Sequence, residues 1–171
     1  ASDVYKRQIY IEGYLLVNEE LVRTTMQKAK KLGLKVALDL SNFNIVNAFK
    51  GMLEDIIPKY VDILFSNESE AEAFTGQKAA EAVHTLSELV EVSLVTLGKE
   101  GALIGSHGQF YSVPAEGGKP VDTTGAGDNF AAGFLYGQSI GASLVQSARI
   151  GSMLAGYVID VVGPEIPYDK W

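Results

Sequence analysis

The segment VDILFSNESEAEAF, residues 61–74, is the clearest indicator of the fold class. Val61–Phe65 is a short, continuous apolar run that predicts a buried strand, and Ser69–Phe74, which follows it, predicts a helix. Polar residues stand at the junction between the two. A strand that leads directly into a helix is the building unit of a parallel α/β sheet, so this segment predicts one such unit.

The same alternation continues on both sides of this segment. Strands are predicted at Ile9–Leu16, Leu34–Leu40 and Val92–Leu97, and helices at residues 18–33, within 42–60 after a loop, and at 79–90. Asn18 is the expected N-cap of the first of these helices. The side chains expected on the apolar faces are Leu21, Met26, Ala29 and Leu32 in the first helix, and Ile45, Val46, Phe49, Met52, Leu53 and Ile56 in the second.

After residue 100 the rhythm changes. Residues 102–105 and 109–113 flank Ser106-His-Gly108 and predict a hairpin, and two long helices are predicted at about 126–139 and 142–161. No repeat or linker interrupts this order. The chain therefore predicts an α/β fold with a mostly parallel sheet and helices on both faces, a Rossmann-like three-layer arrangement.

Composition narrows the class of protein. The 171 residues are 47% hydrophobic and 20% charged, which is ordinary for a globular domain. A net charge of -7 argues against non-specific binding to nucleic acids or anionic membranes. The absence of cysteine excludes disulfides and thiolate metal sites. No apolar run has the length of a membrane span and no signal-peptide pattern opens the chain, so a cytoplasmic location is expected.

The first eight residues, ASDVYKRQ, are polar and contain no initiating methionine. We expect residues 1–8 to be a non-native leader, and a natural frayed terminus is the alternative. The domain itself is expected to cover residues 9–171.

The segment DTTGAGD, residues 122–128, carries the strongest chemical signal. Its small residues let the backbone approach a ligand closely, and they lead into a helix whose first amides can bind an anion such as a phosphoryl group. Asp128, in the first turn, could accept a proton from an attacking hydroxyl. The alternative from spacing alone is a glycine-rich turn in which Asp128 helps to cap the helix.

Residues 122–135, DTTGAGDNFAAGFL, resemble without a gap the C-terminal signature of the PfkB, or ribokinase-like, carbohydrate kinases, which include adenosine kinases. The resemblance implies a ribokinase-like fold of which this chain is about the last half, incomplete on its N-terminal side. It implies that Asp128 is the catalytic base and that the amides of Gly125, Ala126, Gly127 and Asp128 form the anion hole.

Asn67 and Glu70 lie three residues apart, on one side of a helical turn. Their spacing alone favours a structural role, because Asn is a good N-cap and Glu three residues later nearly completes a capping box. The pair also resembles the N-x-x-E motif of the same family. That resemblance implies that Asn67 and Glu70 organise the water shell of Mg²⁺ near the nucleotide phosphates.

The segment TLGKEG, residues 96–101, follows a predicted buried strand, and its glycines permit a tight turn. The resemblance implies that this loop, with Thr96, Gly98 and Gly101, contacts ATP. The sequence contains no G-x-x-x-x-G-K-[ST] motif and no G-x-G-x-x-G after the first strand. These absences argue against a P-loop kinase and against a dinucleotide-binding dehydrogenase.

Two further roles come from the resemblance alone. Many members of the family bind a monovalent cation such as K⁺ beside the anion hole, mostly through backbone carbonyls. The matching positions here are Asp122, Thr124, Val158, Val161 and Gly163. Ser152 matches a position where relatives place an Asn or His near adenine, and its short side chain departs from that pattern.

These observations together predict an ATP- and Mg²⁺-dependent kinase that phosphorylates a hydroxyl of a small sugar or nucleoside, with a homodimer as one assembly of the full-length parent. The family's substrate pocket lies mostly in the half that is absent here. The stretches IYIEGYLL and LDLSNFN within residues 9–44 also resemble adenosine-kinase-like sugar kinases, without naming a substrate. The alternative is a non-catalytic nucleotide- or metabolite-binding module of the same fold.

Overall fold

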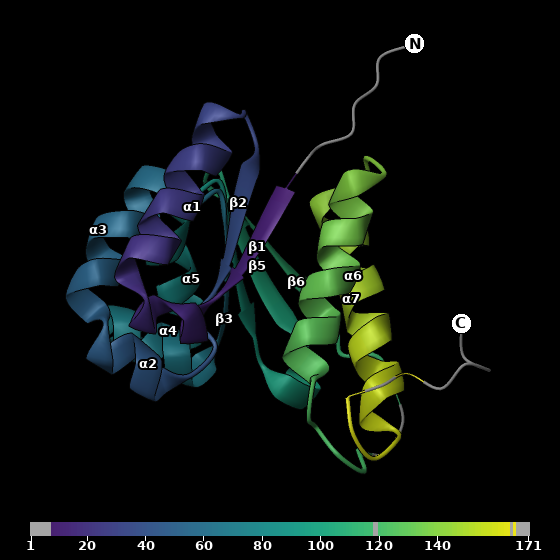
Figure 1. The fold of residues 1–171 in the computed structure, drawn as a ribbon. Helices are drawn as coiled ribbons and strands as arrows, with labels where there is room; N and C mark the ends of the chain where they lie inside the picture. The colour runs from purple at the N-terminus through teal and green to yellow at the C-terminus, as the bar shows by residue number, and fades with distance from the viewer. Residues whose placement is uncertain (1–7, 118–119, 165, 167–171) are drawn as a thin grey trace. The chain divides into compact units, whose positions relative to one another are not determined.

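A computed structural model of the chain describes residues 8–117, 120–164 and 166. Its strands are β1 (Gln8–Glu12), β2 (Lys35–Asp39), β3 (Ile63–Asn67), β4 (Val92–Thr96), β5 (Ala102–Ser106) and β6 (Gln109–Val113). Its α-helices are α1 (Glu19–Lys31), α2 (Phe43–Ala48), α3 (Lys50–Tyr60), α4 (Glu68–Thr75), α5 (Ala79–Ser87), α6 (Ala126–Ser139) and α7 (Leu144–Ile159) (Figure 1). The chain divides into two compact units: the first runs to Thr96 and includes Leu103–Phe110, and the second contains Leu97–Ala102 and the chain from Tyr111 onwards.

The strands form one six-stranded sheet in the order β1-β2-β3-β4-β5-β6. Strands β1 to β4 are parallel, with Glu12 beside Asp39 and Asn67 beside Thr96. β5 runs antiparallel to β4. This direction follows from the hydrogen bond that its last residue, Ser106, donates to the carbonyl of Glu91, just before the first residue of β4. The predicted mostly parallel sheet and the hairpin between β5 and β6 are confirmed.

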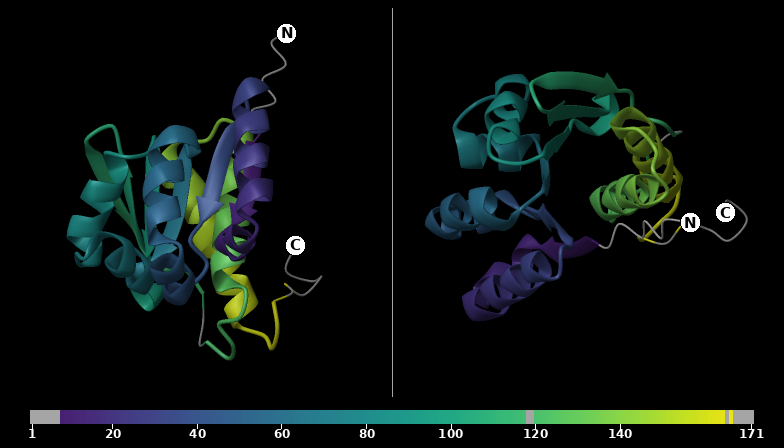
Figure 2. Two further views of the ribbon diagram at one scale, coloured as in Figure 1. Left: turned by 60° about the vertical axis from the view of Figure 1, so that its left-hand side comes forward. Right: turned by 90° about the horizontal axis from the view of Figure 1, so that it is seen from above.

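Within the first unit, helices α1 to α5 all lie on one side of the strands (Figures 1 and 2). Their apolar faces and the strands form a continuous core. Its fully buried large side chains include Leu16, Met26, Leu38, Leu53, Ile56, Leu64 and Leu94. Strands β2, β3 and β4 are buried along most of their length, as expected for the inner strands of a parallel sheet.

The predicted first strand, Ile9–Leu16, is too long. β1 ends at Glu12, and Gly13–Val17 forms a 3₁₀ helix. Gly13 lies so close to the chain after β2 that a Cβ there would be 2.6 Å from the carbonyl oxygen of Leu40, so only glycine fits at this bend. The Gly13 amide leaves the sheet ladder and donates to Ser41 Oγ at 2.7 Å. Of the expected leader, residues 1–7 lie outside the described residues, and Gln8 begins β1.

Two helical predictions also need correction. In α1, which Asn18 caps as predicted through a hydrogen bond from the Leu21 amide, Leu21 and Leu32 are exposed. Val22 takes the core position instead. The predicted single helix within 42–60 is two helices that meet at Phe49. Hydrophobic spacing did not reveal this break.

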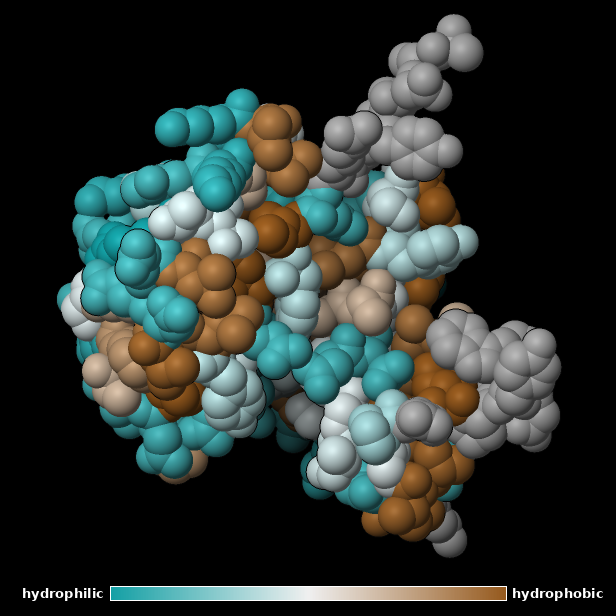
Figure 3. Space-filling model, in the orientation of Figure 1, coloured by the Kyte–Doolittle hydropathy of each residue, from teal (hydrophilic) through white to brown (hydrophobic). Residues whose placement is uncertain are grey.

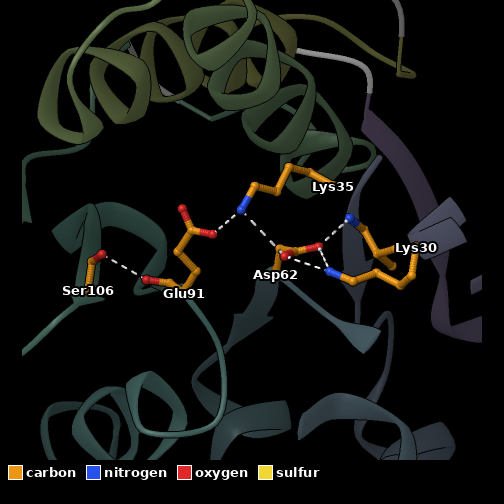
Figure 4. A network of polar contacts seen from close by, with 6 residues as sticks. Lys30, Lys35, Asp62, Glu91 and Ser106 are labelled. Carbon is orange, nitrogen blue, oxygen red and sulfur yellow. Dashed lines mark hydrogen bonds and ion pairs between the residues drawn. The ribbon is translucent and has the colours of Figure 1, made fainter. Parts of the chain in front are cut away.

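A network of ion pairs joins the amino ends of the parallel strands (Figure 4). Lys30 and Lys35 both approach Asp62, at 2.8 and 3.5 Å, and Lys35 also pairs with Glu91. Ser106 Oγ donates to the carbonyl of Glu91 at 2.7 Å. The hydrogen bond to Glu91 is the largest effect that raises the pKa of Lys35. Because a single exposed pair contributes little, the network matters chiefly by holding several strand starts together.

The second unit is built around α6 and α7, which approach closely through glycines. A Cβ built on Gly133 would lie 2.7 Å from Gly151 Cα, and one on Gly137 would lie 2.6 Å from Ser147 Oγ. α7 begins with a complete capping box between Ser143 and Gln146. Close glycine contacts and a firm helix start make this helix pair a rigid support for the turns at its ends.

Apolar side chains also reach the surface of the first unit, and Figure 3 shows brown areas on the side where α1 and α2 lie. Between residues 14 and 43, the exposed large hydrophobic side chains include Tyr14, Val17, Leu21 and Phe43. β1 is an edge strand of the sheet. Among the described residues, no helix combines the length and the apolar character needed to cross a membrane.

Candidate functional site

The start of α6 is an open helix terminus. Gly125 is its N-cap, in the left-handed conformation with φ 77° and ψ 3°, and no side chain caps the helix. The Ala126 amide donates to the Thr123 carbonyl at 3.2 Å. Among the described residues, the amides of Gly127 and Asp128 have no hydrogen-bond acceptor. These two amides are the strongest candidates for binding an anion.

Asp128 lies in the first turn of α6, and its side chain is exposed. Gly127 beside it is also exposed, so the turn is not sealed inside the core. A carboxylate next to free amides combines a proton acceptor with a holder of negative charge. The expected pairing of base and anion hole stays a prediction, and the Ala126 amide already has an internal acceptor, the Thr123 carbonyl.

Asp122 organises the turn that precedes α6. Its Oδ1 accepts from the Thr124 amide at 2.9 Å and from the Thr124 hydroxyl at 2.7 Å. Its Oδ2 accepts from the Gly163 amide at 3.0 Å. The hydrogen bonds from Thr124, followed by that from Gly163, hold the pKa of the Asp122 carboxyl below its usual value. This side chain thus joins the turn before α6 to the segment that follows α7.

The expected cation-binding positions lie on the same two segments of the second unit. Asp122, Thr124 and Gly163 meet through the bonds just described. The Val158 carbonyl, at the end of α7, accepts from the Val161 amide at 3.3 Å. A carbonyl has a second lone pair, so Val158 still has an acceptor site to offer a cation. The cation site itself stays a prediction.

Asn67 and Glu70 form a complete capping box at the start of α4. The Asn67 amide and Nδ2 donate to the two Glu70 carboxylate oxygens at 2.8 and 2.6 Å, and the Glu70 amide donates to Asn67 Oδ1 at 3.0 Å. Asn67 is exposed, whereas Glu70 is only 3% exposed. The pair therefore has the structural arrangement that its spacing favours.

Burial is the main cause that raises the pKa of Glu70, to about 7, and the nearby Asp39 raises it further against the opposing bonds from Asn67. Asp39 ends β2 and Asn67 ends β3, so these groups lie at the carboxyl edge of the sheet. An ionised Glu70 retains lone pairs that Asn67 does not use. A hydrated cation would stabilise that charge, so the residues present fit a water-mediated Mg²⁺ role.

The loop after β4 has the tight geometry that its glycines predict. Gly98 has φ 55° and Gly101 φ 98°, both in the left-handed region. The Leu97 amide donates to the Gly101 carbonyl at 2.8 Å and closes the turn. At the end of β4, the Thr96 hydroxyl makes a long hydrogen bond of 3.4 Å to the carbonyl of Ser66. The turn exposes backbone at Gly98, and contact with a nucleotide stays a prediction.

Ser152 is buried on α7, and its hydroxyl is engaged twice. It donates to the Pro114 carbonyl at 2.8 Å and accepts from the Glu116 amide at 3.1 Å. One residue further on, a Cβ built on Gly117 would lie 2.7 Å from Gly156 Cα. Through these two bonds Ser152 anchors the loop that leaves β6. Its expected contact with adenine stays a prediction.

Sequence reasoning missed two residues of these sites. Asp39 affects Glu70, and only the pairing of β2 with β3 brings the two together. Asn129, next to the expected base, donates from Nδ2 to the carbonyls of Gly125 at 2.9 Å and Pro164 at 3.4 Å. The partner at Pro164 is 35 residues away, so no local pattern could have revealed it.

The sequence and the fold of this chain are similar to those of known proteins. Residues 7–171 match the family described as pfkB family carbohydrate kinase. This chain therefore belongs to the PfkB family of carbohydrate kinases. The relatives that it matches include an adenosine kinase.

The adenosine kinase of Saccharomyces cerevisiae is 34% identical over 176 residues, which cover 94% of this chain and 52% of that protein. A probable sugar kinase from Rhizobium etli CFN 42 has a TM-score of 0.89 and 33% identity over 94% of this chain and 51% of its own. The adenosine kinase of Sinorhizobium meliloti has a TM-score of 0.87 and 33% identity over 93% and 50%. The chain spans about half the length of these relatives, and the ribokinase-like fold is confirmed.

Proposed function

We propose that this chain is the C-terminal, nucleotide-binding part of an ATP-dependent kinase that phosphorylates a hydroxyl of a small sugar or nucleoside. The observation that carries the proposal is the open start of α6, where the free amides of Gly127 and Asp128 adjoin an exposed carboxylate. Membership of the PfkB family supports it, as does the similarity to sugar and adenosine kinases.

In the proposed reaction, the acceptor hydroxyl loses its proton to the Asp128 carboxylate as its oxygen attacks the terminal phosphorus of ATP. The bond from that phosphorus to the bridging oxygen breaks, and ADP leaves with the electron pair. Negative charge spreads over the transferring phosphoryl oxygens, which the amides of Gly127 and Asp128 stabilise. The Gly125 and Ala126 amides complete the proposed hole once the internal bond of Ala126 to Thr123 gives way.

The remaining expected roles belong to the same proposal. Mg²⁺ would supply charge neutralisation at the nucleotide phosphates, with Asn67 and Glu70 ordering its water shell. The loop at Thr96, Gly98 and Gly101 would contact the nucleotide. Backbone carbonyls near Asp122 and Val158 would hold a monovalent cation such as K⁺, which would steady the turn before α6.

The decisive experiment uses the parent protein, by which we mean the longer protein that we propose contains this chain. Its ATP-dependent phosphorylation is measured against ribose, fructose, ketodeoxygluconate and adenosine. Asp128→Asn keeps the shape of the side chain and removes its basicity. We expect turnover to fall by about 10²–10⁴-fold, the usual contribution of general-base catalysis, while nucleotide affinity stays within about twofold.

Glu54→Gln is the matched control, because Glu54 is an exposed carboxylate on α3. Its turnover should equal that of the wild type. Near-normal turnover of Asp128→Asn would remove Asp128 from the mechanism. Nucleotide binding by the wild-type parent without phosphorylation of any acceptor would instead favour a non-catalytic binding module.

A further inference from the structure

The side-chain amide of Asn129 spans two backbone segments of the second unit. Its Nδ2 donates to the Gly125 carbonyl at 2.9 Å, where the backbone amide of Asn129 also donates at 3.0 Å. The same Nδ2 makes a longer contact of 3.4 Å with the Pro164 carbonyl. The side chain therefore ties the cap of α6 to the segment that follows α7.

The two segments are in direct contact at that point. A Cβ built on Gly125 would lie 2.7 Å from Pro164 Cβ, so the proline ring packs against the glycine. Asp122 makes a parallel connection through its bond to the Gly163 amide. The amides of Val121 and Asp122 both donate to the Ile159 carbonyl, at 2.7 and 3.3 Å.

These contacts replace what a capping side chain would do. In most helices an N-cap side chain satisfies the first amides and fixes the direction of the entering chain. Here Gly125 has no side chain to do so, and a left-handed glycine can adopt several backbone conformations at little cost. The direction of the Gly127 and Asp128 amides therefore depends on what holds Gly125 from behind.

We propose that Asn129 is a positioning residue for phosphoryl transfer: by fastening the Gly125 carbonyl to Pro164, it aims the open amides of α6 at the transferring phosphoryl group. The inference rests on the proposed function, because it assumes that these amides hold that group. It predicts an effect on the transition state rather than on nucleotide binding, since catalysis depends on small errors in alignment.

The experiment compares three variants of the parent protein. Asn129→Ala removes both side-chain bonds. Asn129→Ser keeps a donor that can bond back to the carbonyl four residues earlier, Gly125, and is too short to reach Pro164. Asn129→Asp keeps the shape and turns the donor into a second acceptor facing two carbonyls. The matched control is Asn47→Ala, at an exposed asparagine on α2.

We expect turnover to fall about tenfold in Asn129→Ala, two- to threefold in Asn129→Ser and more than tenfold in Asn129→Asp. The KM for ATP should change less than about twofold. A second readout is the affinity for ADP with and without aluminium fluoride, a mimic of the transferring phosphoryl group. The gain in ADP affinity on adding aluminium fluoride should be largest in the wild type, smaller in Asn129→Ser, smaller again in Asn129→Ala and smallest in Asn129→Asp. The control variant should match the wild type.

A purely structural role makes a different prediction. It would lower the melting temperature of the variants and leave both turnover per folded molecule and the aluminium fluoride gain unchanged, which would overturn the inference. Equal turnover of Asn129→Ser and Asn129→Ala would overturn the part assigned to the Gly125 bond. A wild-type parent that phosphorylates no acceptor would overturn the proposed function itself, and the inference with it.

Discussion

Two helix starts in this protein follow opposite rules. At α4, Asn67 and Glu70 satisfy each other's backbone amides, and the carboxylate is buried. At α6, Gly125 offers no side chain, and the acidic residue of the first turn, Asp128, is exposed. β3 leads directly into α4, whereas a turn precedes α6. One closes on itself, whereas the other stays open.

The difference shows how a fold divides stability from binding. A capped helix start contributes about 1 kcal/mol to stability and leaves its amides unavailable. An open start forgoes that contribution, and its partial positive charge remains free for an anion. Since the open start cannot fix itself, it depends on neighbours such as Asp122 and Asn129. Variants at the two starts should therefore behave in opposite ways.

The largest effect is expected from Gly125→Ala, which attacks the open start. An alanine with φ 77° is strained by about 1–2 kcal/mol, and its Cβ would lie 2.7 Å from Pro164 Cβ, which adds about 1–3 kcal/mol of crowding. Turnover of the parent protein should fall more than about 100-fold, because the amides would be misaligned. Calorimetric melting and steady-state kinetics check this, with Gly51→Ala, whose Cβ meets open space, as control. An active Gly125→Ala enzyme would contradict the role of the turn.

The second prediction concerns pH and the closed start. Because burial raises the pKa of Glu70 from 4.5 to about 7, the folded protein binds this proton more tightly than the unfolded chain. The resulting stability is fully present below pH 4.5 and is lost as pH rises through 7. At about 1.4 kcal/mol per pKa unit, the loss is about 3 kcal/mol.

Denaturant unfolding of the parent protein between pH 4 and 8 measures this, and the difference between wild type and Glu70→Gln isolates Glu70. The variant has no proton to exchange, so the wild type should lose stability relative to it as pH rises. A constant difference across the range would show that Glu70 has an ordinary pKa.

A third variant, Gly127→Ala, should separate stability from activity. A Cβ at Gly127 meets no atom within 4 Å, and the residue is helical. Alanine should therefore stabilise the helix by about 0.5–1 kcal/mol. The added methyl group lies beside the proposed phosphoryl site, so turnover should fall about tenfold. Thermal melting and kinetics on the same sample decide the matter, and unchanged turnover would place the phosphoryl group elsewhere.

The smallest effect is expected at the capped start of α7, which lies in the second unit. Ser143→Ala removes the hydroxyl that accepts from the Gln146 amide at the beginning of α7. The loss should cost about 1 kcal/mol or less, with turnover unchanged. A clear loss of turnover per folded molecule would show that closed and open starts are not separable in this fold.

The sequence predicted those features that depend on local patterns. Short apolar runs predicted the strands, and the segments with helical periodicity between them predicted the helices. The N-x-x-E spacing indicated the capping box at Asn67. Prediction failed where distant contacts decide the local structure. The strand from Ile9 ends at Glu12 because Gly13 meets Leu40, and Val22 displaces Leu21 because of how α1 rests on the sheet.

The sites show the same limit. The segment 122–128 predicted the start of α6 with Asp128 in its first turn, because these features lie within one local pattern, while the catalytic roles stay a prediction. The raised pKa of Glu70 depends first on its burial and then on the nearby Asp39, and the anchoring by Asn129 depends on the position of Pro164, so each needs the tertiary structure. The contact of Ser152 with adenine stays a prediction, but no local pattern could have revealed that its hydroxyl bonds to the carbonyl of Pro114, 38 residues earlier.

The charged network of Lys30, Lys35, Asp62 and Glu91 lies at the amino ends of β2 to β4, while Asp39, Asn67 and Thr96 lie at the carboxyl ends of the same strands. One strand length thus separates the ion pairs from the residues for which we propose ligand contacts. An engineer could recharge, label or immobilise the braced end without touching the reactive one.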